Sequence, residues 1–129
     1  MQCLTPKSMV ELSGALAQAT PATRILAGGT DYVLHERKGG LTPDLLIYPG
    51  AIPELRQISL TEDGLTIGAM VTMREIADAL SSVPAYRAIA DMAANVGSPQ
   101  IRNKATLAGN LANASPAGDS LPVCLLYQA

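Results

Sequence analysis

The sequence predicts an α+β fold, because strand and helix patterns are arranged in two different ways along its 129 residues. Short apolar segments alternate with helical ones over residues 9–47, which is typical of a small βαβ unit with a parallel pair of strands. Two further strand segments, residues 52–60 and 65–69, are joined by a turn and followed by helical patterns. A proline-bounded break between these regions predicts two subdomains, residues 1–52 and 53–129.

Helix starts are marked by two capping boxes, at residues 8–11 and 72–75, in which a hydroxyl precedes a glutamate by three positions. The first predicts a helix that ends before Pro21, and the second predicts a helix to about Leu80. A third helix is predicted over residues 84–95. The apolar residues along one packed side of the first helix are Met9, Leu12, Leu16 and Ala19.

A glycine turn at residues 28–29 separates a predicted buried strand, residues 24–27, from a helix that starts at Asp31 and ends at residues 39–40. A second buried strand is predicted at residues 45–47. A strand, a glycine turn and a helix start direct several N–H groups outward at the positive end of a helix, which suits a phosphate. The turn matches neither the dinucleotide G-x-G-x-x-G pattern nor a P-loop, and by itself it favours a plain tight turn.

The stretch from Gly97 to Pro122 is long, poor in charge and rich in Gly, Asn, Ser, Thr and Ala. Segments of this length are usually functional or disordered, and the recurring Ile and Leu residues argue for order. We therefore predict an ordered segment whose small residues let the backbone approach a bound polar molecule. Arg102 has two interpretations that the sequence leaves open: it neutralises a phosphate, or it holds backbone carbonyls of the loop.

Composition excludes several classes of function. The net charge of −2 argues against a nucleic-acid surface, and no apolar run approaches the length of a membrane span. Two distant cysteines, Cys3 and Cys124, and one histidine are too few for an iron–sulfur cluster or a structural zinc site. His35 lacks a partner at a catalytic spacing, so we interpret it as a surface residue and predict no catalytic side chain and no metal ligand. Two small-residue polar segments without side-chain chemistry indicate cofactor binding.

Three motifs carry a resemblance to a known family: ILAGGTD at residues 25–31, LTIGAMVTMREIA at residues 65–77, and RNKATLAGNLANASPAGDSLP at residues 102–122. In this order they resemble the FAD-binding (medium) subunit of the molybdenum hydroxylases, the xanthine dehydrogenase and carbon monoxide dehydrogenase family. The resemblance covers nearly the whole chain. It implies the two-subdomain FAD-binding fold of that family, FAD as cofactor, and an electron-transferring oxidoreductase flavoprotein.

The resemblance also implies which residues bind FAD. The first loop would hold the pyrophosphate through backbone amides, and the second would face the dinucleotide. The matching positions are Ala27, Gly28, Gly29, Thr30, Asp31, Thr106, Gly109, Asn110, Ser115 and Asp119. Asp119 would accept a hydrogen bond from a ribose or ribityl hydroxyl. The alternative interpretation is structural: Asn110 and Asn113 cap turns, and Asp119 is the N-cap of the last helix.

By the same resemblance, the subunit passes electrons between iron–sulfur centres of a partner chain and an external acceptor, often NAD, beside a molybdopterin subunit. The two cysteines, interpreted as separate thiols, favour a cytoplasmic protein. The alternative is a binding or assembly module that keeps the fold without a working flavin. The family's flavin domain continues beyond the length of this chain, so we expect an N-terminal portion of the subunit. Alone it is expected to hold FAD weakly and to self-associate, as a symmetric dimer, through uncovered apolar surface.

Overall fold

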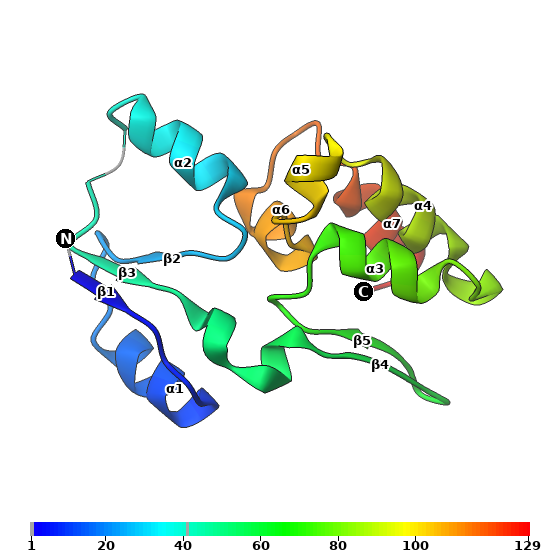
Figure 1. Ribbon diagram of the computed structural model, residues 1–129, viewed down its shortest axis with the longest axis horizontal. Helices are drawn as coiled ribbons and strands as arrows, with labels where there is room; N and C mark the ends of the chain where they lie inside the picture. The colour runs from blue at the N-terminus through cyan, green and yellow to red at the C-terminus, as the bar shows by residue number, and fades with distance from the viewer. Residues whose placement is uncertain (1, 41) are drawn as a thin grey trace.

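The computed structural model describes residues 2–40 and 42–129, and Figure 1 shows its elements in two groups. One group contains a three-stranded parallel sheet, and the other contains a two-stranded antiparallel hairpin with most of the helices. Two 3₁₀ turns, Pro49–Ala51 and Pro53–Arg56, connect the groups. Parallel strands, an antiparallel hairpin and separate helices confirm the α+β prediction.

The parallel sheet has the strand order β1-β3-β2, with β3 in the centre. Its strands are β1 (Gln2–Leu4), β2 (Arg24–Ile25) and β3 (Leu45–Ile47). Helix α1 (Met9–Ala17) connects β1 to β2, and helix α2 (Thr30–Arg37) connects β2 to β3. The two helices lie on opposite sides of the sheet in Figure 1, as crossovers in opposite directions require. The sheet is therefore the predicted βαβ arrangement extended by one strand.

The hairpin pairs β4 (Ile58–Thr61) with β5 (Gly64–Ile67), so that Ile58 lies opposite Ile67 and Leu60 opposite Leu65. Helix α3 (Met73–Leu80) follows it directly and packs against α4 (Arg87–Asn95). The core beside the hairpin has nine buried residues: Val71, Met73, Ile76, Leu80, Ile89, Ala90, Met92, Ala93 and Ala105. Met73 thus fills the core, the common use of methionine.

The predicted loop over residues 97–122 is largely helical in the structure. It contains α5 (Pro99–Arg102), α6 (Leu107–Asn113) and the start of α7 (Ser120–Leu126). The Ser98 hydroxyl accepts a hydrogen bond from the Ile101 N–H, and Thr106 caps α6 in the same way. Short helices fit this small-residue stretch because α5 and α6 each receive a side-chain cap at the N-terminus. The expectation of order is confirmed, and the expectation of a long loop is wrong.

Both predicted capping boxes start helices. Thr72 and Glu75 form the reciprocal pair at α3, and the Ser8 hydroxyl accepts from the Glu11 N–H at α1. At α1 the Glu11 carboxylate accepts from the N–H of Lys7 rather than of Ser8. The prediction that α1 packs along an apolar side is wrong, because Met9 and Leu16 are 47% and 40% exposed and only Ala15 of this helix is buried.

Three further predictions need correction. Strand β2 has two residues instead of four, and Ile25 is 57% exposed because β2 is an edge strand. Strand β4 starts at Ile58, since the prolines before it fix a 3₁₀ turn instead of a strand. The helix predicted from Pro84 begins as a 3₁₀ turn and becomes α-helical at Arg87. The longest described helices have nine residues, and none is long and apolar enough to cross a membrane.

Candidate functional site

The two segments singled out in the sequence meet in the structure. Gly28 lies so close to the backbone of Lys104 that a Cβ atom at this position would collide with the Lys104 carbonyl oxygen. A Cβ atom on Gly109 would lie 3.5 Å from the Cβ of Ala27. Glycine is therefore required at residue 28 by the close approach of two chain segments. In Figure 1 the turn between β2 and α2 lies beside α6, at the contact between the two groups of elements.

A pocket of about 540 Å³ opens along this contact, within the volume range of small-molecule sites. Its walls come from the two segments, with Pro49, Ala69 and Met70 between them. The first segment contributes Arg24, Ile25, Leu26, Ala27, Gly28, Gly29, Thr30, Asp31, Tyr32 and His35, and the second contributes Ala105, Thr106, Ala108, Gly109, Asn110, Ala112 and Asn113. Small side chains dominate both walls, so backbone groups are accessible from the pocket.

The first wall presents the N-terminus of α2. Gly29 precedes this helix with φ of 73°, a left-handed conformation that glycine adopts without strain, and its carbonyl accepts from the Val33 N–H. The first N–H groups of a helix lack an intrahelical acceptor. Within residues 2–40 and 42–129, the N–H groups of Gly28 and Thr30 have no hydrogen-bond acceptor. Together with the helix dipole, they form a donor-rich end that attracts an anion.

The second wall presents the N-terminus of α6. The Thr106 hydroxyl, 2% exposed, accepts a hydrogen bond from the Gly109 N–H at 3.0 Å and so caps the helix. A Cβ atom on Gly109 would lie 2.9 Å from this hydroxyl oxygen, so the absence of a side chain permits the cap. The Leu107 N–H finds no hydrogen-bond acceptor among the described residues. Thr106 and Gly109 thus shape the second wall and leave N–H donors at its end.

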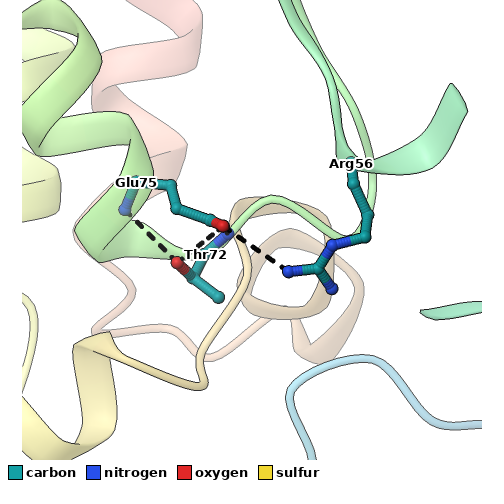
Figure 2. A network of polar contacts seen from close by, with 3 residues as sticks. All are labelled: Arg56, Thr72 and Glu75. Atoms are coloured by element: carbon teal, nitrogen blue, oxygen red, sulfur yellow. Dashed lines mark hydrogen bonds and ion pairs between the residues drawn. The ribbon is translucent and has the colours of Figure 1, made fainter. Parts of the chain in front are cut away.

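The second wall is fixed to the helical core through α3. Thr72 and Thr106 form an antiparallel bridge, and the Met73 N–H donates to the Ala105 carbonyl at 2.8 Å. Figure 2 shows how Thr72 itself is held: the Glu75 carboxylate accepts from the Thr72 N–H and hydroxyl at 2.7 and 2.8 Å. Arg56 lies 3.5 Å from the same carboxylate. The hydrogen bond from the Thr72 backbone is the largest of the effects that lower the pKa of Glu75 below 4.5.

Besides Tyr32, three side chains in the pocket wall are ionisable: Arg24, Asp31 and His35. The Arg24 guanidinium donates to the carbonyls of Pro21 and Thr23 at 2.7 and 2.8 Å. Its Nη1 atom is therefore held by the backbone just before β2. His35 is exposed in the second turn of α2, as predicted for a surface residue. The described residues contain no group of three or more His, Cys, Asp or Glu side chains suited to a metal ion.

The structure brings eight of the ten predicted site residues to the pocket wall and leaves two outside it. Ser115 lies in the turn after α6, where its carbonyl accepts from Gly118. Asp119 is exposed at the N-cap position of α7, but its side chain makes no capping hydrogen bond. The side-chain amide oxygen of Asn110, Oδ1, accepts a hydrogen bond from the hydroxyl of the fully buried Ser120. This bond connects α6 to α7. Whether these ten residues bind FAD stays a prediction.

The described contacts decide between the two interpretations of Arg102, and the pocket wall contains a tyrosine that was not predicted. Arg102 donates to the carbonyls of Val96 and Gly97, so it holds the chain before α5 instead of facing the pocket. Tyr32 lines the pocket from the first turn of α2, although nothing in the sequence distinguishes it from a core or surface tyrosine. Met70, which is 3% exposed, also lines the pocket.

The chain matches a family model over its whole length. A model described as FAD binding domain in molybdopterin dehydrogenase covers residues 1–129. The nicotinate dehydrogenase FAD-subunit of Eubacterium barkeri is 39% identical over 119 residues, which are 90% of this chain and 40% of that protein. The xanthine dehydrogenase FAD-binding subunit of Escherichia coli O157:H7 is 33% identical over 110 residues, which are 84% of this chain and 38% of that protein.

Solved structures give the same relationship. Carbon monoxide dehydrogenase from Hydrogenophaga pseudoflava contains a chain that superposes with a TM-score of 0.80 at 31% identity, covering 93% of this chain and 42% of that chain. Quinoline 2-oxidoreductase from Pseudomonas putida 86 gives a TM-score of 0.75 at 30% identity, covering 88% and 39%. The chain therefore spans about two fifths of the length of these four relatives.

Proposed function

The chain belongs to the family of FAD binding domains in molybdopterin dehydrogenase, and we propose that its pocket holds the dinucleotide part of FAD. The observation that carries this proposal is the contact of Gly28 with the backbone of Lys104, which joins the two glycine-containing segments into one pocket. Each segment contains the N-terminus of a helix, so two sets of N–H donors serve one site. A diphosphate has acceptor oxygens on both phosphates and fits donors on two walls.

Each part of the chain has a separate task in this proposal. Gly29 turns the backbone so that the N–H groups before and within the first turn of α2 reach the phosphates. Thr106 and Gly109 hold the N-terminus of α6 against Ala27. Pro49, Ala69 and Met70 would contact the cofactor between the two segments. When bound, FAD supplies the electron transfer, and these residues supply position and electrostatics.

The wider function follows from the relatives and is likewise proposed. The chain would form part of an oxidoreductase subunit, with residues 1–52 and 53–129 as two subdomains that enclose the cofactor between them. Its partners would be an iron–sulfur subunit and a molybdopterin subunit, and an external acceptor such as NAD would exchange electrons with the flavin. Relatives named as FAD subunits of nicotinate and xanthine dehydrogenases, and the medium chain of a carbon monoxide dehydrogenase, support this assignment. A module without a working flavin is the alternative that the following experiment tests.

The first test is titration of the chain with FAD, followed by flavin fluorescence and carried to high FAD concentration so that weak binding is also measured. We expect saturable binding by the unaltered chain. Gly29→Val should weaken it by about tenfold or more, because a β-branched residue resists positive φ and costs on the order of 1–3 kcal/mol there. The variant should also melt earlier, because the strained conformation at residue 29 lowers the stability of the folded chain.

Gly29→Asn is the matched control, because asparagine tolerates the left-handed conformation far better than valine and adds a Cβ atom at the same place. It should melt close to the unaltered chain and keep most of its FAD affinity. Saturable binding that survives Gly29→Val unchanged would show that this turn is not the phosphate site. An unaltered chain that leaves FAD fluorescence constant at every concentration would favour the module without a flavin.

A further inference from the structure

Ser120 is a fully buried serine at the start of α7, and its hydroxyl has one hydrogen bond among the described residues. That bond is donated to Oδ1 of Asn110, on α6. A buried hydroxyl that found no acceptor for its proton would lose the hydrogen bond that it makes with water in the unfolded chain. The side chain of Asn110 therefore has to offer an acceptor to Ser120.

This requirement fixes the orientation of the Asn110 amide. An asparagine amide has an acceptor oxygen on one arm and a donor nitrogen on the other. If the amide were turned round, Nδ2 would face the Ser120 hydroxyl and leave the hydroxyl proton without an acceptor. Oδ1 also lies near the turn before α7, because a Cβ atom on Gly118 would be 3.7 Å from it. The oxygen arm thus faces α7, and the nitrogen arm points in another direction.

The nitrogen arm of Asn110 is a free donor at the pocket. Asn110 is half-buried and lines the pocket, which no residue of α7 does. Its Nδ2 atom has no hydrogen-bond partner among the described residues. In the buried and half-buried residues of that part of the chain, the Tyr32 hydroxyl is the single side-chain nitrogen or oxygen that is both shielded from solvent and unpaired. Nδ2 is therefore accessible to a ligand.

We infer that Ser120 is a positioning residue for the cofactor, an inference that rests on the proposed function. Ser120 holds the Asn110 amide by its oxygen, so that Nδ2 donates a hydrogen bond to an acceptor oxygen of the FAD bound in the pocket. Without this bond the amide is free to turn and to present its own oxygen, which repels an acceptor oxygen of the cofactor. Through one hydroxyl, α7 then acts on a pocket that it does not line.

A titration with FAD, followed by NMR of the isotope-labelled chain, observes the Asn110 amide directly. The side-chain signals that disappear in Asn110→Ala identify it. In the unaltered chain we expect the two Nδ2 protons to shift as FAD saturates the site and to exchange more slowly with water, because they gain an acceptor. The titration also gives the dissociation constant for FAD.

Ser120→Ala removes one oxygen atom and with it the restraint on the amide. The dissociation constant for FAD should rise about three- to tenfold, the scale of a single hydrogen bond. The shift of the Asn110 Nδ2 protons at saturation should become smaller, because the amide no longer keeps one orientation. Ser120→Cys, which retains a weak donor, is a second variant and should give values between those of Ser120→Ala and the unaltered chain.

Ser98→Ala is the matched control, because it also removes a serine hydroxyl with one hydrogen bond. The Ser98 hydroxyl accepts from the Ile101 N–H at 3.3 Å and lies outside the pocket. The control should lower the melting temperature, and it should leave FAD affinity and the response of the Asn110 signals unchanged.

Three outcomes would overturn the inference while the proposed function stands. In the first, the Asn110 Nδ2 protons neither shift nor exchange more slowly when FAD saturates the unaltered chain. In the second, Ser120→Ala binds FAD as the unaltered chain does. In the third, Ser120→Ala loses affinity but keeps the full shift of the Asn110 signals, as a purely structural role of the serine would produce. Failure of the unaltered chain to bind FAD is a different result, which would remove the proposed function and the inference with it.

Discussion

The parallel-sheet part and the helical part of the chain differ in how much they bury. The nine-residue core lies entirely within residues 71–105, where α3 packs against α4. In the sheet part, α2 has no buried residue and α1 has only Ala15, so burial is concentrated in the central strand β3 and the turn after it. The pocket lies between the two parts. One of its walls therefore has a dense core behind it, and the other belongs to a helix that few contacts hold.

This difference indicates how the two walls contribute to binding. The second wall is fixed before any ligand arrives, because Thr106 and Ala105 are bonded to the start of α3. The first wall carries the N–H groups of α2, whose side chains are exposed or only partly buried. Elements with few buried contacts open locally at low free energy. A ligand that bridges the walls would stabilise the sheet part more than the helical part.

The largest effect that tests this comparison comes from the same substitution in each part. Ile76→Ala, at a residue with no exposed surface in the core, should lower the free energy of unfolding by about 2–5 kcal/mol. Ile25→Ala, at a residue that is 57% exposed on β2, should lower it by less than about 1 kcal/mol. Chemical denaturation measures both. Equal losses would show that the sheet part is packed as firmly as the helical part.

The next effect concerns the contact between the parts. Gly28→Ala places a methyl group against the Lys104 carbonyl, and backbone on both sides must move. We expect a loss of about 1–3 kcal/mol in unfolding free energy, the usual cost of overpacking, and a parallel loss of FAD affinity. Denaturation and FAD titration measure the two quantities.

Gly14→Ala is the matched control for that variant, because a Cβ atom at residue 14 meets nothing within 4 Å on α1. It should stabilise the chain by about 0.5–1 kcal/mol, since alanine is the better helix former, and should leave FAD affinity unchanged. A Gly28→Ala variant that behaves like the control would mean that the two parts are not held together at this contact.

The sequence predicted local features well and burial poorly, for a physical reason. A capping box needs only residues three positions apart, so both boxes start helices as predicted. Burial depends on what packs against a face, which periodicity does not specify, and the apolar side of α1 is consequently exposed. The glycine- and asparagine-rich stretch after residue 97 has weak helix propensity, yet it forms short helices because Ser98 and Thr106 cap them.

The candidate site was predictable to the extent that its walls are continuous in sequence. Backbone segments with small residues are recognisable, and they line the pocket at residues 27–31, 105–106 and 108–110. Ser115 and Asp119 lie outside the wall because the chain turns away after α6, a turn that the left-handed conformation of Ala114 makes and that no pattern predicts. Tyr32 was not predicted as a wall residue, because only the folded chain shows that this tyrosine lines the pocket and that its hydroxyl lacks a partner among the described residues.

The smallest effect compares one carboxylate from each part. The Thr20 hydroxyl is the main cause of the lowered pKa of Asp44 in the sheet part, and the Thr72 backbone N–H is the main cause for Glu75 in the helical part. A carboxylate with a lowered pKa contributes stability that is complete above its unfolded value, 4.5 for Glu75, and that is lost as the pH falls through the folded value. Each contribution should be lost as the pH falls below the unfolded value of its own carboxylate.

Glu75→Gln isolates the charge-dependent part, because glutamine still completes a capping box. The variant should melt slightly earlier than the unaltered chain at about pH 7, and this difference should shrink as the pH falls below the unfolded value and through the folded value of Glu75. The effect is small because the Glu75 side chain is 48% exposed and its pairing with Arg56 is correspondingly weak. Glu62→Gln, in the exposed turn of the hairpin, is the control and should not change the pH dependence. A Glu75→Gln difference that persists unchanged at low pH would show that the carboxylate acts by shape and not by charge.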